Sequence, residues 1–155
     1  HDALSDAAPA ATVIHVATHG LVDARRPRLS ALALTPGPEG HAAFQLFDIL
    51  QMHLRARMVV LSACDTSQGR LLPGEGVLGL AQAFLQAGSQ SVIASYWRVQ
   101  DATVGAFMDR FYRHLLADRL PVATALRRTQ VELASQGDSY EWAAFSLYGR
   151  PDSTL

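Results

Sequence analysis

Short apolar runs alternate along this chain with segments whose apolar residues recur at helical spacing. The runs that predict buried strands are 12–18, 58–62, 91–97 and 142–148, with a minor strand at 32–34. The segments with helical spacing are 46–54, 75–87, 102–117 and 121–135. Gly88 follows the second of these as a predicted left-handed C-cap. Strands that alternate with helices predict βαβ units, a mostly parallel sheet and an α/β fold.

Length and composition are those of one folded domain. The chain has 155 residues, of which 49% are hydrophobic and 17% charged, and this is enough apolar surface for a buried core. We expect the domain to span residues 12–150. Residues 1–11 then form a loose lead-in or linker, and 151–155 form a tail.

Charge and residue usage exclude several classes of function. The net charge is -1, so we expect no general electrostatic binding to nucleic acid. All 13 cationic side chains are Arg, and the lack of Lys excludes Schiff-base, Walker and kinase-type lysine chemistry. The single cysteine, Cys64, excludes an internal disulfide and a Cys-rich zinc site.

The same features predict a cytoplasmic protein without membrane contact. A single cysteine fits a reducing compartment. No apolar run approaches the roughly 18 residues of a membrane span. Residues 1–6 lack the basic start and the apolar stretch of a signal peptide, and the missing initiator Met predicts a fragment or a processed chain.

Two reactive residues follow the first two predicted strands. His19 closes one strand and Cys64 follows the next, at the sheet edge where open α/β sheets bind their ligands. A thiolate is a strong nucleophile, and a nearby imidazole can raise its population and then protonate the leaving amine. The N–H groups of Gly20 and Cys64 are candidate donors to an oxyanion. The alternative is a buried thiol and a hydrogen-bonded imidazole without chemistry.

Several ordered motifs resemble those of a known family. Residues 15–20, His-Val-Ala-Thr-His-Gly, and residues 61–66, Leu-Ser-Ala-Cys-Asp-Thr, resemble the signatures of the CHAT domain, a prokaryote-rich family of caspase-like, clan CD cysteine peptidases. The likeness covers roughly residues 12–150 and continues through 74–77, 91–95, 97–101, 111–115 and 142–145. Caspases themselves carry Gly two positions after the Cys, where this chain has Thr66.

The resemblance implies a caspase-like, three-layer α/β/α fold and a cysteine endopeptidase. His19 would be the catalytic acid/base, Cys64 the nucleophile, and the amides of Gly20 and Cys64 the oxyanion donors. No metal or organic cofactor is expected. The substrate would be a protein or peptide, in a bacterial defence or cell-death pathway, with TPR or other sensor modules upstream or in a separate chain. Caspase-like folds begin with further strands, so an N-terminal fragment or another chain is expected to complete the sheet.

Three residues near the same sheet edge are candidate substrate contacts. Asp101 follows the third strand and would select a basic substrate residue by pairing with Arg or Lys. Its alternative role is to cap the following helix. Asp65 would contact substrate or orient its loop, and Trp97 would line a pocket wall, with solvation and core packing as their respective alternatives.

Other readings of the sequence remain open. The same fold can serve as a catalytically inactive scaffold that binds protein partners. Residues 74–79 spell the dinucleotide fingerprint GxGxxG, but about ten residues separate it from the preceding strand, where the motif should follow directly. His15 and His19 lie too far apart along a strand to share a metal ion without other ligands. We expect His114, on the long helix, to be exposed.

Overall fold

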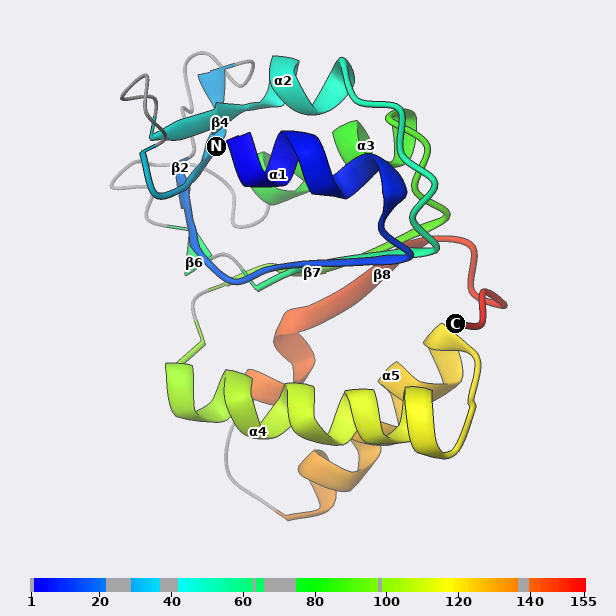
Figure 1. The fold of residues 1–155 in the computed structure, drawn as a ribbon. Coiled ribbons are helices and arrows are strands. Elements are labelled where there is room, and N and C mark those ends of the chain that lie inside the picture. Colours follow the sequence, from blue (N-terminus) through cyan, green and yellow to red (C-terminus); the bar gives the residue numbers. More distant parts are fainter. Residues whose placement is uncertain are drawn as a thin grey trace.

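The central sheet of the protein has four strands in the order β1-β5-β7-β8 (Figure 1). The computed structural model describes residues 2–21, 29–36, 42–62, 64–65, 75–97, 99–136 and 140–155. The four strands are β1 (Val13–Val16), β5 (Met58–Leu61), β7 (Ser91–Ser95) and β8 (Phe145–Gly149). The first three are parallel and β8 runs antiparallel to β7. Every residue of β5 and β7 is buried, as expected for parallel strands covered on both faces.

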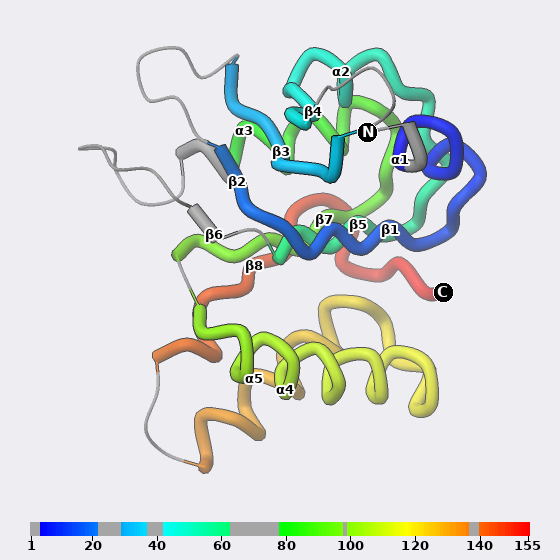
Figure 2. The backbone as a smooth tube through the Cα atoms, turned by 60° about the vertical axis from the view of Figure 1, so that its left-hand side comes forward, coloured from blue at the N-terminus to red at the C-terminus, as the bar shows by residue number. Residues whose placement is uncertain are grey.

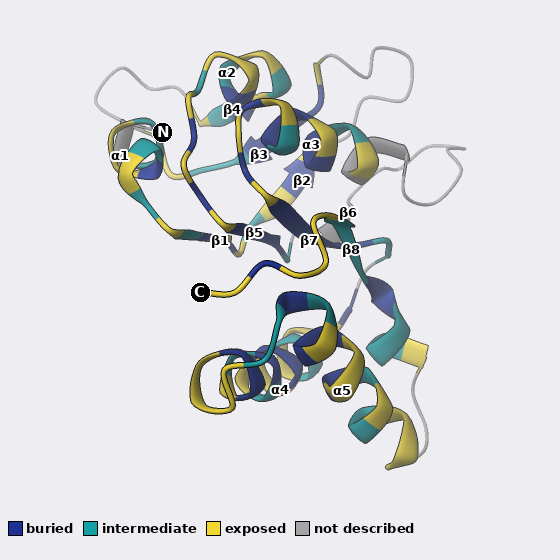
Figure 3. Cartoon of the chain, turned by 90° about the vertical axis from the view of Figure 1, so that its right-hand side faces the viewer, coloured by how far each residue is buried: buried dark blue, intermediate teal, exposed yellow. Residues whose placement is uncertain are grey.

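Helices cover both faces of this sheet (Figures 1 and 3). One face carries α1 (Asp2–Ala7), α2 (Leu46–Leu50) and α3 (Glu75–Gln86). The other carries α4 (Asp101–Tyr112), which continues into a π-helical turn (Arg113–Ala117), and α5 (Val122–Ser135). Successive side chains of β5 enter two separate cores: Val59 joins the first layer of helices and Val60 the second. This is the predicted three-layer α/β/α arrangement with a mostly parallel sheet.

A second, smaller sheet extends the carboxyl end of the first (Figure 2). Its order is β4-β3-β2-β6, with β2 (His19–Leu21), β3 (Ala31–Ala33), β4 (Ala43–Gln45) and β6 (Cys64–Asp65). β2 follows β1 along the chain and β6 follows β5. Both pairs, β1 with β5 and β2 with β6, are parallel, so two neighbouring chain segments stay side by side as they leave the central sheet.

Several element boundaries differ from the prediction. The predicted first strand is divided: β1 ends at Val16, and His19 begins β2 in the second sheet. The lead-in forms α1 and a short 3₁₀ helix, because Leu4 and Ala8 pack against the first core. Strand β4 was not predicted. Residues 142–144 belong to a 3₁₀ helix (Tyr140–Ala144), so β8 begins later than expected.

Helix α2 is shorter than predicted, and the backbone contacts explain why. A capping box begins it, in which the Gln45 N–H donates to the Asp48 carboxylate over 2.8 Å. The chain then becomes extended, and the Leu54 N–H donates to the Ala87 carbonyl at the end of α3 over 2.7 Å. Gly88 lies next to this contact with φ +114°, which confirms the predicted left-handed cap.

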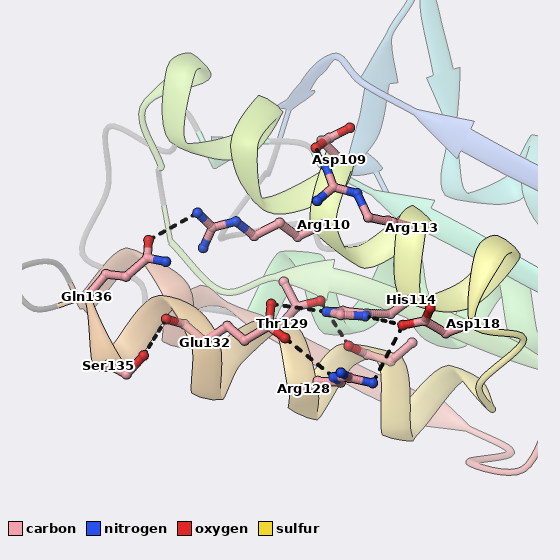
Figure 4. A network of polar contacts seen from close by, with 11 residues as sticks. Asp109, Arg110, Arg113, His114, Asp118, Arg128, Thr129, Glu132, Ser135 and Gln136 are labelled. Atoms are coloured by element: carbon pink, nitrogen blue, oxygen red, sulfur yellow. Dashed lines mark hydrogen bonds and ion pairs between the residues drawn. The ribbon is translucent and has the colours of Figure 1, made fainter.

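His114 is buried, with 7% of its surface exposed, so the prediction of an exposed residue was wrong. Its Nδ1 lies 2.8 Å from Asp118 Oδ2 and its Nε2 lies 3.1 Å from Glu132 Oε2 (Figure 4). Arg128 lies between the same two carboxylates, at 3.5 Å and 3.4 Å. The network joins the π-helical turn to α5. Glu132 comes from a different helix, so helical spacing around His114 could not reveal it.

This network predicts loss of stability in acid. The hydrogen bond from His114 is the main cause that lowers the pKa of Asp118 and of Glu132 from their ordinary values of 3.8 and 4.5. Folding therefore favours the ionised carboxylates. Their contribution is complete above the unfolded pKa values and is lost as the pH falls through the lowered, folded ones. We expect Glu132→Gln to reduce the dependence of the unfolding free energy on pH below about 4.5 in urea titrations.

Asp109→Asn is the matched control for this experiment. Asp109 of α4 forms an exposed pair with Arg113, the first residue of the π-helical turn, and takes no part in the contacts of His114 with Asp118 and Glu132. This substitution should leave the pH dependence of the unfolding free energy close to that of the wild type. An equal effect of the two variants would assign the acid sensitivity to general surface charge.

Candidate active site

The backbones of His19 and Cys64 lie directly opposite each other. β2 and β6 pair in parallel, with His19 against Cys64 and Gly20 against Asp65. The preceding strands pair in the same direction, with Val16 against Leu61. The sequence placed both residues at the tips of strands; the structure places them in short strands that extend those tips. For Cys64 and Asp65 the structure describes the backbone.

A cavity of about 470 Å³ opens beside His19. Its lining comes from the β1–β2 segment, the residue after β5 and the first two-thirds of α4. The lining residues are His15, Ala17, Thr18, His19, Ser62, Asp101, Val104, Gly105 and Met108. The cavity is thus at the carboxyl end of the sheet, where an α/β fold binds its ligands.

Asp101 is exposed and lines this cavity as the first residue of α4. The N-cap position belongs to Gln100, so Asp101 does not occupy the capping position considered as its alternative role. Its charge is still favourable in the first turn of a helix. The carboxylate of Asp101 and the imidazole of His19 therefore line the same cavity.

The other predicted residues have different surroundings. Gly20 is buried in the middle of β2, paired with Leu32 of β3 and with Asp65 of β6. Trp97 packs against the core beneath α4, and its ring lies 5.9 Å from that of Tyr140. Trp97 is absent from the described lining of the cavity, so its packing agrees with the core alternative rather than with a pocket wall.

A polar chain that was not predicted from the sequence lies beside the cavity, and two of its members line it. His15 Nε2 lies 3.1 Å from Ser62 Oγ, and Tyr112 Oη lies 3.0 Å from His15 Nδ1. The His15 and Tyr112 rings are 5.7 Å apart. The available signal was the alternation in β1, where Ile14 and His15 take opposite faces.

His15 and Tyr112, the two titratable residues of this polar chain, both favour their neutral forms. His15 keeps an exposed side toward the cavity, yet the surrounding protein removes enough water to lower its pKa. Burial also raises the pKa of Tyr112 to about 12. A neutral imidazole between two hydroxyl groups can donate from one nitrogen and accept at the other.

Neither a metal centre nor a membrane-spanning helix is found among the described residues. Within those ranges, no three His, Cys, Asp or Glu side chains are grouped closely enough to hold a metal ion. None of the described helices combines the length and the apolar character needed to cross a bilayer. The glycine fingerprint at 74–79 lies partly outside the described residues, and a Cβ added at Gly79 would lie 3.6 Å from Leu46 Cδ1, an ordinary packing distance.

Comparison with known proteins gives one family and two relatives. Residues 1–150 match the family model of the CHAT domain. Two curated proteins named Tetratricopeptide repeat protein 28, from Mus musculus and Homo sapiens, are each 34% identical to the chain over 104 residues. The aligned part is 66% of this chain and 4% of each relative, so the chain spans a small fraction of their length.

Proposed function

Because the chain belongs to the CHAT domain family, which is caspase-like, we propose that it is a cysteine endopeptidase with a His19–Cys64 dyad. The observation that carries this proposal is the pairing of His19 with Cys64 across β2 and β6, beside a cavity that His19 lines. No other cysteine occurs in the chain. In this proposal the nucleophile and its base come from paired strands, which supports the proximity that the mechanism needs.

The proposed reaction uses covalent catalysis. The Cys64 thiolate attacks the carbonyl carbon of the scissile peptide bond and forms a tetrahedral intermediate. The His19 imidazolium gives its proton to the leaving amine, the C–N bond breaks, and a thioester remains. Water then attacks the thioester while His19 accepts its proton. The C–S bond breaks, which releases the acid and restores the thiolate.

The oxyanion needs donors at the junction of β2 and β6. We retain the amides of Gly20 and Cys64 as proposed donors, since both belong to the backbone around the dyad. Gly20 is buried between β3 and β6, so its N–H would serve the oxyanion in addition to, or in exchange for, its contact within the sheet. No metal or organic cofactor takes part in the proposed reaction.

A catalytically inactive scaffold is the second candidate. The observation that favours it is that both named relatives are long proteins named for their tetratricopeptide repeats. A library of peptides of mixed sequence, incubated with the wild type and with Cys64→Ala, separates the two candidates by mass spectrometry. Cleavage that depends on Cys64 supports the peptidase, and the same fragments from both proteins would contradict it.

The cavity predicts a preference for Arg or Lys on the amino side of the cleaved bond. Asp101 supplies the carboxylate, and a charge-assisted hydrogen bond contributes about 1.5–3 kcal/mol. We expect Asp101→Ala to lower kcat/KM for Arg and Lys substrates by about 10- to 100-fold. For a substrate with the uncharged norleucine at that position, Asp101→Ala should change kcat/KM little. Asp65, opposite Gly20, is a second proposed substrate contact.

Asp109→Ala is the control for the Asp101 experiment. It removes a carboxylate from the same helix, at an exposed position outside the cavity lining. Asp109→Ala should keep the preference for Arg or Lys substrates. An unchanged cleavage profile in Asp101→Ala would refute the selector role and leave the dyad untouched.

The sheet geometry suggests where partners would join. β1 is the edge strand of the central sheet as described, with β5 on its one paired side. We propose that a strand from an N-terminal fragment or another chain pairs there, and that TPR or other sensor modules lie upstream or in a separate chain. A bacterial defence or cell-death role, and a cytoplasmic location, also remain proposals, since the two named relatives are mammalian.

A further inference from the structure

The proposed reaction does not use a polar chain of three side chains that lies beside the cavity. Tyr112 of α4, His15 of β1 and Ser62 after β5 are joined by contacts of 3.0 Å and 3.1 Å. His15 and Ser62 also line the cavity. Three elements that surround the cavity are thus connected through one imidazole ring.

Two members of this polar chain, His15 and Ser62, are close to the proposed dyad along the backbone. His15 precedes His19 by four residues and Ser62 precedes Cys64 by two. The Ser62 N–H donates to the Val16 carbonyl over 3.1 Å, which continues the β1–β5 pairing beyond Leu61. The next registered pair is His19 with Cys64. The His15–Ser62 contact therefore joins the ends of β1 and β5 shortly before the backbone reaches the dyad.

The surroundings of His15 differ from those of its apolar neighbours on β1. Ile14 and Val16 bury themselves in the first core, whereas His15 faces α4 from the other side of β1. A ring with two hydrogen-bond partners has a fixed orientation, whereas an apolar side chain there would hold neither Ser62 nor Tyr112. The lowered pKa of His15 and the raised pKa of Tyr112 agree with a neutral, hydrogen-bonded chain.

We propose that His15 is a positioning residue, which uses Tyr112 and Ser62 to hold the segment after β5 in register with His19. This inference rests on the proposed dyad. A small displacement of a reacting atom costs up to about 100-fold in rate, so a loosened register should lower kcat more than it changes KM. The expected signature is therefore slower chemistry at Cys64 with similar substrate binding.

Alkylation of the thiol gives a readout that does not require peptide cleavage. The chain has a single cysteine, so incorporated iodoacetamide reports on Cys64 alone. A free thiol has a pKa of about 8.5, so rapid alkylation at pH 6 requires a thiolate stabilised by a nearby cation. His19→Ala measures how much of that reactivity comes from the dyad, and alkylation in urea gives the unfolded reference.

Three variants each interrupt the polar chain: Tyr112→Phe and Ser62→Ala each remove one hydroxyl group, and His15→Phe replaces the imidazole by an aromatic ring that cannot form these hydrogen bonds. We expect each to lower the alkylation rate at pH 6 and kcat by about tenfold, with KM within about twofold of the wild type. The double variant Tyr112→Phe/Ser62→Ala should be no slower than His15→Phe, because both remove the same connection. Thr129→Ala is the control: Thr129 is buried in α5, bonds the Ala125 carbonyl at 2.9 Å, and lies outside the cavity lining.

The outcomes distinguish the positioning role of His15 from the proposed dyad. Alkylation that depends on His19 but not on His15, Tyr112 or Ser62 overturns the positioning role and leaves the dyad in place. Alkylation that is indifferent to His19→Ala overturns both. Reactivity that depends on His19 and on the chain, without cleavage of any peptide, supports the positioning role and contradicts the peptidase. An equal loss in Thr129→Ala would mean that reduced stability alone explains the effect, which also overturns the positioning role.

Discussion

Replacing either member of the dyad should abolish peptide cleavage. Cys64→Ala removes the only thiol in the chain, and His19→Ala removes the imidazole paired with it across β2 and β6. Residues that act as one nucleophilic unit each cost about 10⁴-fold or more in kcat, and their losses do not add. We therefore expect kcat/KM to fall by at least about 10⁴-fold in each single variant and no further in the double variant.

Substrate binding separates a chemical loss from a folding defect. His19 is exposed, so its replacement should leave the core filled, and Cys64→Ala removes only one sulfur atom. Both variants should keep the wild-type melting temperature and retain binding of a peptide with a basic residue, measured by fluorescence anisotropy. Activity of His19→Ala within tenfold of the wild type would remove His19 from the mechanism.

Gly149→Ala should cause a large loss of stability for so small a substitution. Gly149 ends β8 with φ +88°, and an added Cβ would lie 2.4 Å from the Gln90 carbonyl oxygen and 2.8 Å from Leu85 Cδ2. A left-handed backbone costs a non-glycine residue about 1–2 kcal/mol, and crowding a packed site adds about 1–3 kcal/mol. We expect a loss of roughly 2–5 kcal/mol in the unfolding free energy, measured by urea titration.

Gly105→Ala is the matched comparison for this stability prediction. Gly105 lies inside α4, and an added Cβ would meet nothing within 4 Å. Replacing a helix-interior glycine by alanine gains up to about 1 kcal/mol, so the two glycines should give changes of opposite sign. A Gly149→Ala variant as stable as the wild type would show that β8 and the Gln90 turn can separate without cost.

Much of the fold follows from local patterns in the sequence. Continuous apolar runs identified β5 and β7, because strands buried on both faces carry no polar alternation. Gly88 was predicted as a left-handed cap from its position alone. The second sheet was harder to predict, since β2, β4 and β6 have two or three residues each and depend on pairing with distant segments.

In the candidate site, too, some residues followed from local sequence patterns and others did not. His19, Cys64 and Asp101 stood out because each follows a predicted strand, where an α/β fold collects its reactive groups. The Tyr112–His15–Ser62 chain did not, because its members are 97 and 47 residues apart along the sequence. The register between β1, β5 and α4 brings them together, and no local pattern encodes that register.

The most direct test of the dyad is the mass of the protein after reaction with a peptidyl acyloxymethyl ketone that carries Arg next to the reactive carbonyl. The account predicts one adduct per chain, mapped to Cys64 by digestion, formed at least about 100-fold more slowly in His19→Ala. An adduct on another residue, or equal rates in the wild type and in His19→Ala, would contradict a thiol and an imidazole acting together.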